Sequence, residues 1–270
     1  MSTGRNIDHF VVTVPDLDRA AAAFEALGFT LTPRAQHPWG TANRLAQFAG
    51  GNFIELLEID RPELLDAEQR DYDFGGFTKD FLSRGMGPSM LVLATDDADA
   101  DTRRYAEAGI ASFPRFDFER TGRLPDGSEA KMAFSIAHTA DPAMPSAGFF
   151  TCHNRYPENF WKPDYQRHAN GAQEIVSVYL AAADPAAHGA FLAGFSGGTV
   201  TETADGIDVS CGEHVAHVVN PDAAARLGAS PDLNHGPRFI GAEIASSSPP
   251  AERSLPDAAH GMLIVWRNAG

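Results

Sequence analysis

The chain repeats one order of strand, acidic turn and helix, and this repeat constrains its fold more than any single motif. The first copy opens with a β-branched run at residues 7–14, turns at "PDLD" and continues as an amphipathic helix that Gly28 is placed to end. Predicted strands at 29–32, 43–49 and 53–59 follow, so the first 60 residues are predicted to form βαβββ. A unit that recurs along a chain predicts an architecture made of its copies.

Later stretches of the chain follow the same order with decreasing fidelity. The second copy spans 87–155 and closes on "AKMAFSIAH" and "GFFTCHN", the third begins at "EIVSVYLAAADPAAHG", and the fourth keeps only "RFIGAEIAS" and "GMLIVW". We therefore predict an α+β fold of repeated βαβββ modules with a degenerate last module. The modules 1–60 and 87–155 would form a first domain, 1–155, and residues 174–270 a second, with 156–173 as the linker.

The composition is that of an ordinary globular protein, with 43% hydrophobic residues in a chain of 270. A formal net charge of −15 argues against nucleic-acid binding, which needs clustered lysine and arginine. No apolar run approaches the roughly 20 residues that cross a bilayer, and the N-terminus lacks a signal-peptide core. We expect a cytoplasmic protein whose partners are small molecules. Cys152 and Cys211 lack metal or redox spacing and are expected to be buried thiols.

The stretch "GGNFIELLEI", residues 50–59, carries a carboxylate inside an apolar strand. Burying an unpaired carboxylate is costly, so Glu55 needs a partner. Alternation along the strand puts Glu55 on one face with Phe53 and Leu57. The partner could be Arg44 on the neighbouring predicted strand, which would make the pair structural or a substrate clamp. It could instead be a bound cation, which would turn the burial of Glu55 into coordination.

The first copy resembles the vicinal oxygen chelate superfamily, and more narrowly its glyoxalase-like domain proteins, of the glyoxalase, bleomycin resistance and dioxygenase type. The resemblance rests on "DHFVVTVPDLDRAAAAFEALGF", "NRLAQF" and "NFIELLEI". The stretches "GRLPDGSEAKMAFSIA", "GFFTCHNRYPENFW" and "RHANGA" are similar to a bacterial glyoxalase-like subgroup, and the likeness covers roughly residues 7–220. It implies that two βαβββ modules form a cupped, barrel-like mixed sheet that encloses a site.

In metal-binding members of that superfamily, the ligands come from the first and last strands of each module. Carried over by position, the resemblance implies His9 and Glu55 from the first module and Ser89 and His153 from the second, although a slip of one residue would turn Cys152 inward instead of His153. Imidazoles and a carboxylate on adjacent strands can hold a divalent ion and leave positions open for a substrate's oxygens. The implied metal ligands are His9, Glu55 and His153, with zinc, nickel, manganese, cobalt and iron not distinguished.

Each of these residues also has a plainer interpretation. His9 could be a hydrogen-bonded core histidine, His153 could lie in solvent beside a turn, and Ser89 departs from the ligand pattern, so that no metal would be bound. Trp161 and His168 resemble positions of the glyoxalase-like subgroup and are candidate substrate contacts, but packing of the linker is the favoured explanation for both. In the second half of the chain, Ser177 aligns with His9 and His217 roughly with Glu55; one histidine does not make a metal site, so that half is expected to have a structural role or to extend the pocket.

Two functions of different class follow from these residues. The first is a metal-dependent lyase or isomerase of glyoxalase type, in which the ion polarises vicinal oxygens of a small molecule and Glu55 is ligand or base; an extradiol-type dioxygenase, with two His and one Glu around iron, is its enzymatic alternative. The second is a metal-free binding protein of the sequestering or resistance type. In either, Arg44 and Ser89 are candidate substrate contacts, and the modules could pair within one chain or across a homodimer.

Overall fold

The computed structural model describes residues 4–65, 71–123, 127, 129–250 and 253–269, and their strands form two sheets. The strands of the first sheet are β1 (Ile7–Thr13), β2 (Ala35–Gln36), β3 (Thr41–Gln47), β4 (Phe53–Ile59), β5 (Gly87–Ala94), β6 (Phe116–Arg123), β7 (Glu129–Thr139) and β8 (Gly148–Asn154). The strands of the second are β9 (Ala172–Ala181), β10 (Val200–Thr203), β11 (Gly206–Cys211), β12 (His214–Val219), β13 (Arg238–Ser246) and β14 (Leu263–Asn268). The α-helices are α1 (Leu17–Ala26), α2 (Phe74–Ser83), α3 (Ala98–Glu107), α4 (Pro157–Phe160), α5 (Gly189–Ser196) and α6 (Pro221–Leu227), and short 3-10 turns are η1 (Pro62–Leu64), η2 (Pro185–His188) and η3 (Pro256–Ala259).

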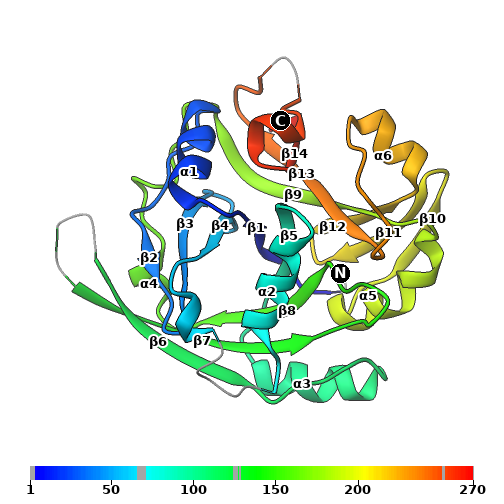
Figure 1. Ribbon diagram of the computed structural model, residues 1–270, viewed down its shortest axis with the longest axis horizontal. Coiled ribbons are helices and arrows are strands. Elements are labelled where there is room, and N and C mark those ends of the chain that lie inside the picture. The colour runs from blue at the N-terminus through cyan, green and yellow to red at the C-terminus, as the bar shows by residue number, and fades with distance from the viewer. Residues whose placement is uncertain (1–3, 66–70, 124–126, 128, 251–252, 270) are drawn as a thin grey trace.

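The first sheet joins two modules of the same chain along β1 and β5. Its order is β2-β3-β4-β1-β5-β8-β7-β6, with β1 and β5 antiparallel at the centre and β4 and β8 parallel to them on either side. The second sheet, β10-β11-β12-β9-β13-β14, repeats this pattern, and its last module contributes only β13 and β14 among the described residues. The predicted α+β fold of βαβββ modules with a degenerate last copy is confirmed (Figure 1).

One face of each sheet packs against the other sheet through apolar side chains. Phe10 of β1 and Phe149 of β8 both contact Phe239 of β13, with ring centroids 5.3 and 5.7 Å apart. All three side chains are buried, and burying an aromatic side chain stabilises a fold by roughly 1.5–3 kcal/mol. This shared core leaves the opposite, concave face of the first sheet turned away from the second sheet, where a separate apolar cluster lines it.

Aspartate caps fix where the helix begins in each of the first two modules. The Asp16 carboxylate accepts a hydrogen bond of 2.9 Å from the backbone N–H of Arg19, and Gly28, with a φ of +88°, ends the first helical segment as predicted. In the second module, Asp97 accepts a 2.9 Å hydrogen bond from the N–H of Ala100 and caps α3 in the same way. The two caps are 81 positions apart, which sets the correspondence between the modules.

The strand predicted at 29–32 does not form. The N–H of Thr32 donates to the Leu45 carbonyl, and the N–H of Leu45 donates to the Thr32 hydroxyl, both at 2.9 Å. In a regular strand pair the Thr32 carbonyl, not its hydroxyl, would accept the second bond. Pro33 follows and has no N–H to donate. Pairing resumes only as the two-residue β2, while the other strands predicted for the first module form as β1, β3 and β4.

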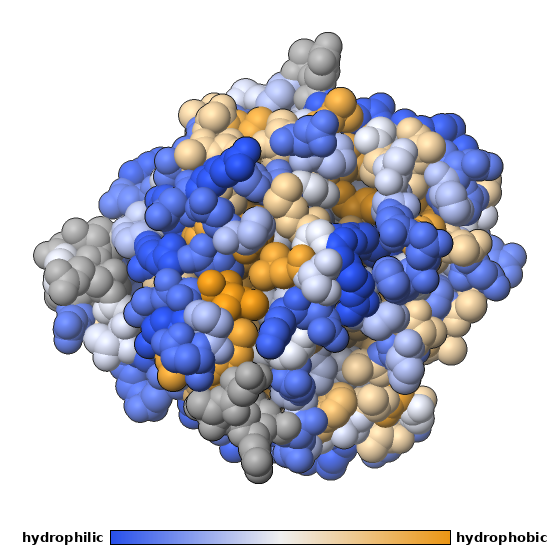
Figure 2. Space-filling view, viewed as in Figure 1, coloured by the Kyte–Doolittle hydropathy of each residue, from blue (hydrophilic) through white to orange (hydrophobic). Residues whose placement is uncertain are grey.

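The surface is mostly hydrophilic on the face seen in Figure 2, with apolar residues gathered near its middle. This agrees with the acidic composition and the net charge of −15, because the charged side chains of a folded protein lie mostly on its surface. Within the described part of the chain, no helix has the length and apolarity needed to span a membrane.

Candidate functional site

The concave face of the first sheet encloses a small cavity of about 60 Å³, which we call the inner cavity. Aromatic side chains form most of its walls: Phe53, Phe134 and Phe150 come from the sheet, Phe74 from α2 and Phe160 from α4. Polar and charged side chains reach it at six positions, His9, His37, Asn43, Glu55, Arg120 and His138. Because the walls are apolar, interactions among these polar groups are only weakly screened by water.

Glu55 is the buried carboxylate of this cavity, with 8% of its surface exposed. The side-chain amide of Asn43 donates a hydrogen bond of 2.6 Å to Glu55 Oε1. The Nε2 atom of His9 lies 3.5 Å from Glu55 Oε2, and the Nε2 atom of His37 lies 4.0 Å from Oε1. Glu55 therefore has an amide donor and two imidazoles as partners.

Both imidazoles are oriented by a group on their other nitrogen. The Nδ1 atom of His9 lies 2.5 Å from a carboxylate oxygen of Asp8, and Nδ1 of His37 lies 2.8 Å from the hydroxyl of Thr41. The Nε2 atom of His9 faces Glu55, so Asp8, His9 and Glu55 lie in series, with one ring nitrogen toward each carboxylate.

Arg44 is not the partner of Glu55. The register of β3 and β4 pairs Leu45 with Glu55, so Arg44 points to the opposite face of the sheet. There its guanidinium donates to the Thr32 carbonyl and to Glu25, both at 2.9 Å. The predicted pairing of Arg44 with Glu55 is wrong, and Arg44 lines neither the inner cavity nor the larger cavity beside it, described below.

Met90 and Phe150 occupy the second-module positions that correspond to His9 and Glu55. The offset of 81 positions between the helix caps places Met90 opposite His9. Glu55 pairs with the residue two places after His9, and Phe150 pairs with the residue two places after Met90. The second module therefore presents apolar side chains where the first presents an imidazole and a carboxylate.

Ser89 and His153 lie elsewhere than the sequence alignment implied. Ser89 sits where the β1–β5 register shifts, is fully buried, and its hydroxyl lies 2.7 Å from that of Thr13. On β8 it is Cys152 that lines the inner cavity, so His153 points to the other face. Ser89 was one residue out because the alignment matched Asp96 with Asp16, whereas the cap of α3 is Asp97. His153 came from matching "TCH" with "FIE", which is three residues beyond Phe150, the position that corresponds to Glu55.

The donor set does not fit the divalent ion that the resemblance implied. Of the three implied ligands, His9 and Glu55 come together and His153 does not. Among the described residues, no three His, Cys, Asp or Glu side chains are placed to hold a metal ion. Phenyl and thioether groups fill the matching second-module positions, and neither is a usual ligand for a divalent ion such as zinc or manganese.

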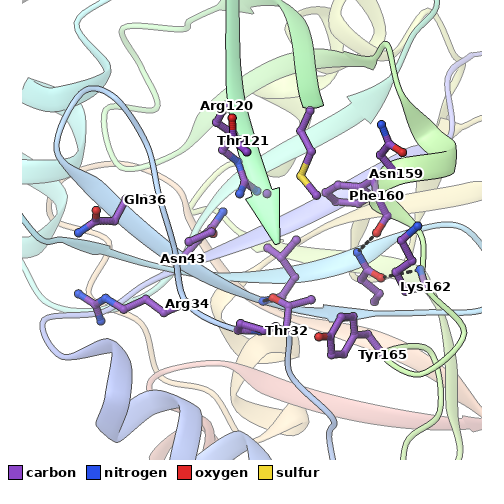
Figure 3. Close-up of a pocket in the computed structure, with 16 residues that line it drawn as sticks. Thr32, Arg34, Gln36, Asn43, Arg120, Thr121, Asn159, Phe160, Lys162 and Tyr165 are labelled. Atoms are coloured by element: carbon purple, nitrogen blue, oxygen red, sulfur yellow. Dashed lines mark hydrogen bonds between the residues drawn. The ribbon is translucent and has the colours of Figure 1, made fainter. Parts of the chain in front are cut away.

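A larger cavity of about 480 Å³, which we call the outer cavity, adjoins the inner one at the rim of the first sheet (Figure 3). The two cavities share four lining residues, Asn43, Leu45, Arg120 and Phe160. Figure 3 shows Arg34 and Gln36 on one side of the outer cavity and Lys162 and Tyr165 on the other. Arg120 borders both cavities; burial lowers the pKa of its guanidinium, and the charge of Glu55 opposes that shift.

The linker between the sheets closes one wall of the outer cavity. The side chain of Gln47 donates a hydrogen bond of 2.9 Å to the Phe160 carbonyl. His168 accepts a 3.0 Å bond from the N–H of Thr30 at Nδ1, and its Nε2 lies 2.7 Å from the Gln47 carbonyl. Burial lowers the pKa of His168, which favours this neutral form. His168 therefore anchors the linker, and Trp161 packs against Phe160 with ring centroids 5.0 Å apart.

Four polar residues of the inner cavity were not foreseen from the sequence: His37, Asn43, Arg120 and His138. Asn43 could have been found, because a hairpin register that aligns Leu45 with Glu55 also turns Asn43 inward. Arg120 could not, since it reaches the site only when β6, the far edge of the first sheet, curves back toward β3.

The second sheet carries a more open polar group at the matching positions. Ser177 and His217 occupy the places of His9 and Glu55, as the sequence alignment predicted. The Nδ1 atom of His217 lies 2.7 Å from a carboxylate oxygen of Asp208, and its ring stacks on Tyr179 with centroids 5.0 Å apart. This face therefore has an imidazole with a structural partner, and its carboxylate beside Ser177, Glu243, accepts a 3.3 Å bond from the Ser177 hydroxyl but is only half-buried.

Comparison with known proteins agrees with this geometry at the level of fold and family. The model of the glyoxalase-like domain matches residues 7–195. A hypothetical protein from Staphylococcus aureus is similar over 97% of this chain and 99% of its own, with 14% identity and a TM-score of 0.74. A mutant 4-hydroxymandelate synthase from Streptomyces coelicolor is similar over 90% of this chain and 71% of its own, with 15% identity and a TM-score of 0.50.

A methylmalonyl-CoA epimerase from Mycobacterium tuberculosis is similar over 57% of this chain and 90% of its own, with 19% identity and a TM-score of 0.40. No match was found among curated proteins. At such identities the solved structures bear on the fold alone, whereas the domain model spans most of the sequence. The chain belongs to the glyoxalase-like domain family of the vicinal oxygen chelate superfamily.

Proposed function

We propose that this protein binds a small oxygenated organic molecule in the inner and outer cavities, and that Glu55 exchanges a proton with it in an isomerase- or lyase-type reaction. The observation that carries the proposal is the buried Glu55 carboxylate, which faces a cavity with His9 3.5 Å away and His37 4.0 Å away. A carboxylate in an apolar cavity beside two imidazoles can act as a general base or a general acid.

Proton abstraction next to a carbonyl fits these groups. Glu55 would take the proton from carbon as the general base, and the negative charge that develops on the carbonyl oxygen would be met by the Arg120 guanidinium. The proton would return to the neighbouring carbon from Glu55, or from His9 after transfer along the series with Asp8. No step needs a group outside the chain, which suits a site whose residues do not fit a divalent ion.

A second candidate is a binding protein without catalysis. The aromatic walls of the inner cavity favour a binding protein, because Phe53, Phe134 and Phe150 can stack against a ligand but make few polar contacts with it. In that case Glu55 and its partners would only orient the ligand. The two candidates differ in one measurable property, which is exchange of substrate hydrogen with solvent.

Hydrogen exchange with deuterated water tests the proposal. A panel of 2-oxo and 3-oxo acids, including pyruvate, acetoacetate and phenylpyruvate, would be incubated with the protein, and deuterium at the carbon beside the carbonyl followed by proton NMR. For at least one acid we expect exchange about a hundredfold faster with wild type than with Glu55→Gln. Glu119→Gln is the matched control, because Glu119 is an exposed carboxylate on β6 that pairs with Lys131. Equal rates in wild type and Glu55→Gln across the panel would overturn the catalytic proposal, and binding without exchange would favour the second candidate.

A further inference from the structure

We propose that the outer cavity holds the anionic part of the ligand, so that the substrate is an organic anion, a carboxylate or a phosphate, whose small oxygenated end enters the inner cavity. This inference rests on the proposed function and names its substrate class. The relative sizes of the cavities support it, because about 60 Å³ accommodates only a small group, whereas about 480 Å³ accommodates the body of a metabolite.

The charge of the outer cavity is opposite to that of the protein. The chain has 36 acidic and 21 basic side chains, so an arbitrary cavity would more often be lined by carboxylates. The described lining of the outer cavity nevertheless contains Arg34, Arg120 and Lys162 and no Asp or Glu. A concave surface of one charge sign, surrounded by a surface of the other, concentrates ligands of the opposite sign.

Two of the three cations can take part in binding. Arg34 is bonded to Glu58 and Asp60, and it holds the pKa of the Asp60 carboxyl below its usual value, so its charge is already balanced. Arg120 has an Nε–H with no hydrogen-bond partner among the described residues. Lys162 uses its Nζ atom for one bond of 2.8 Å to the Glu158 carbonyl, and an ammonium has three hydrogens to donate.

Arg120 also links the anion to the reacting end of the ligand. It lines both cavities, and its charge interacts with that of Glu55. A guanidinium can bind carboxylate or phosphate through two parallel hydrogen bonds, which fixes orientation as well as position. A guanidinium has five N–H donors, so Arg120 could bind the anion together with Lys162 and still donate to the carbonyl oxygen of the uncharged end, which would point toward Glu55.

Matched anionic and neutral probes test this inference. The dissociation constants of 3-phenylpropanoate, phenyl phosphate and the neutral 3-phenylpropanamide would be measured by ligand-observed NMR on the full chain. We expect one anion to bind wild type roughly tenfold or more tightly than the amide, since charge-assisted hydrogen bonds are worth that much; whether it is the carboxylate or the phosphate identifies the anion. Arg120→Met and Lys162→Met should each reduce that preference several-fold. Arg115→Met should keep it, because Arg115 is engaged with Asp99 and Asp117 and lines neither cavity.

The controls separate this inference from the catalytic proposal. Circular dichroism and urea midpoints would establish that each variant folds, and Lys162→Met gives an independent reading if Arg120→Met does not fold. Equal binding of anions and amide, an anion preference that survives both substitutions, or no binding of any probe to wild type would overturn the inference. Glu55-dependent deuterium exchange without an anion preference would leave only the catalytic proposal standing, whereas an anion preference without exchange would leave only the anion site.

Discussion

The side-chain amide of Asn43 donates to the carboxylate of Glu55 at 2.6 Å, and both residues are buried, with 4% and 8% of their surfaces exposed. This contact resolves the apparent conflict of a carboxylate within an apolar strand. A hydrogen bond to an ionised acceptor stabilises more than one between neutral groups, and it offsets part of the cost of removing the charge from water. Glu55 thus has a partner supplied by the chain itself, on the adjacent strand and the same face.

Removing this donor should destabilise the fold. In Asn43→Ala, the buried carboxylate loses its hydrogen bond, and we expect the free energy of unfolding in urea to fall by about 1–3 kcal/mol. Asn159→Ala is the matched control, because Asn159 lies at the rim of the outer cavity and its exposed side-chain amide donates to the Lys131 carbonyl, so a change within about 0.5 kcal/mol is expected. An Asn43→Ala variant as stable as wild type would mean that Glu55 does not depend on this contact.

Metal content should not depend on the inner cavity. For protein purified without chelator, we expect elemental analysis to find well under one divalent ion per chain, and the same amount in His9→Ala. The reason is the set of available ligands: the second-module positions that correspond to His9 and Glu55 hold Met90 and Phe150. Stoichiometric metal in wild type that is lost in His9→Ala would contradict this account and restore the metal-dependent lyase or dioxygenase.

The linker should loosen at acidic pH through His168. Burial holds the pKa of His168 below its ordinary value of 6.5, so the folded state favours the neutral ring and the unfolded state binds the proton more readily. This contribution to stability is therefore complete above about pH 6.5 and declines as the pH falls through and below that value. In His168→Gln, which can still accept from Thr30 and donate to the Gln47 carbonyl, we expect a smaller loss of unfolding free energy between about pH 7 and pH 5. Identical pH dependence in the two proteins would count against a neutral, half-buried His168.

Filling the inner cavity from β8 should block ligand binding. Cys152 lines that cavity and His153 points to the other face, so Cys152→Leu should weaken binding of the tightest probe by roughly tenfold or more through steric exclusion. His153→Leu introduces the same side chain one residue away and should leave affinity close to wild type. The reverse pattern would show that the register of β8 differs by one residue and that His153 is the inward group.

The fold could be predicted from the sequence because each copy of the repeat contains local signals for its strands, helix cap and turn. The β-branched run of β1, the capping Asp16 and the stop at Gly28 are each recognisable without a structure, and their recurrence gives the modules. The strand predicted at 29–32 does not form, and the reason is also local: the Thr32 hydroxyl, instead of a backbone carbonyl, accepts the hydrogen bond from Leu45.

The site could be predicted only in part because it depends on register and curvature. His9 and Glu55 lie on adjacent parallel strands, so their proximity follows from the module alone. Ser89 and His153 required a register accurate to one residue, and a displacement of that size turns every side chain to the other face. Arg120 required the curvature of the whole first sheet, which brings β6 toward β3, and no local pattern contains that information.

A crystal structure of wild type with the tightest-binding acid of the deuterium-exchange panel tests the central claim most directly. The expected result is the acid in the cup of the first sheet, with its carbonyl end in the inner cavity against Glu55 and its anion on Arg120. A ligand bound elsewhere, for example on the open face of the second sheet beside Tyr179 and His217, would contradict the account, because the enclosed carboxylate would then have no part in binding.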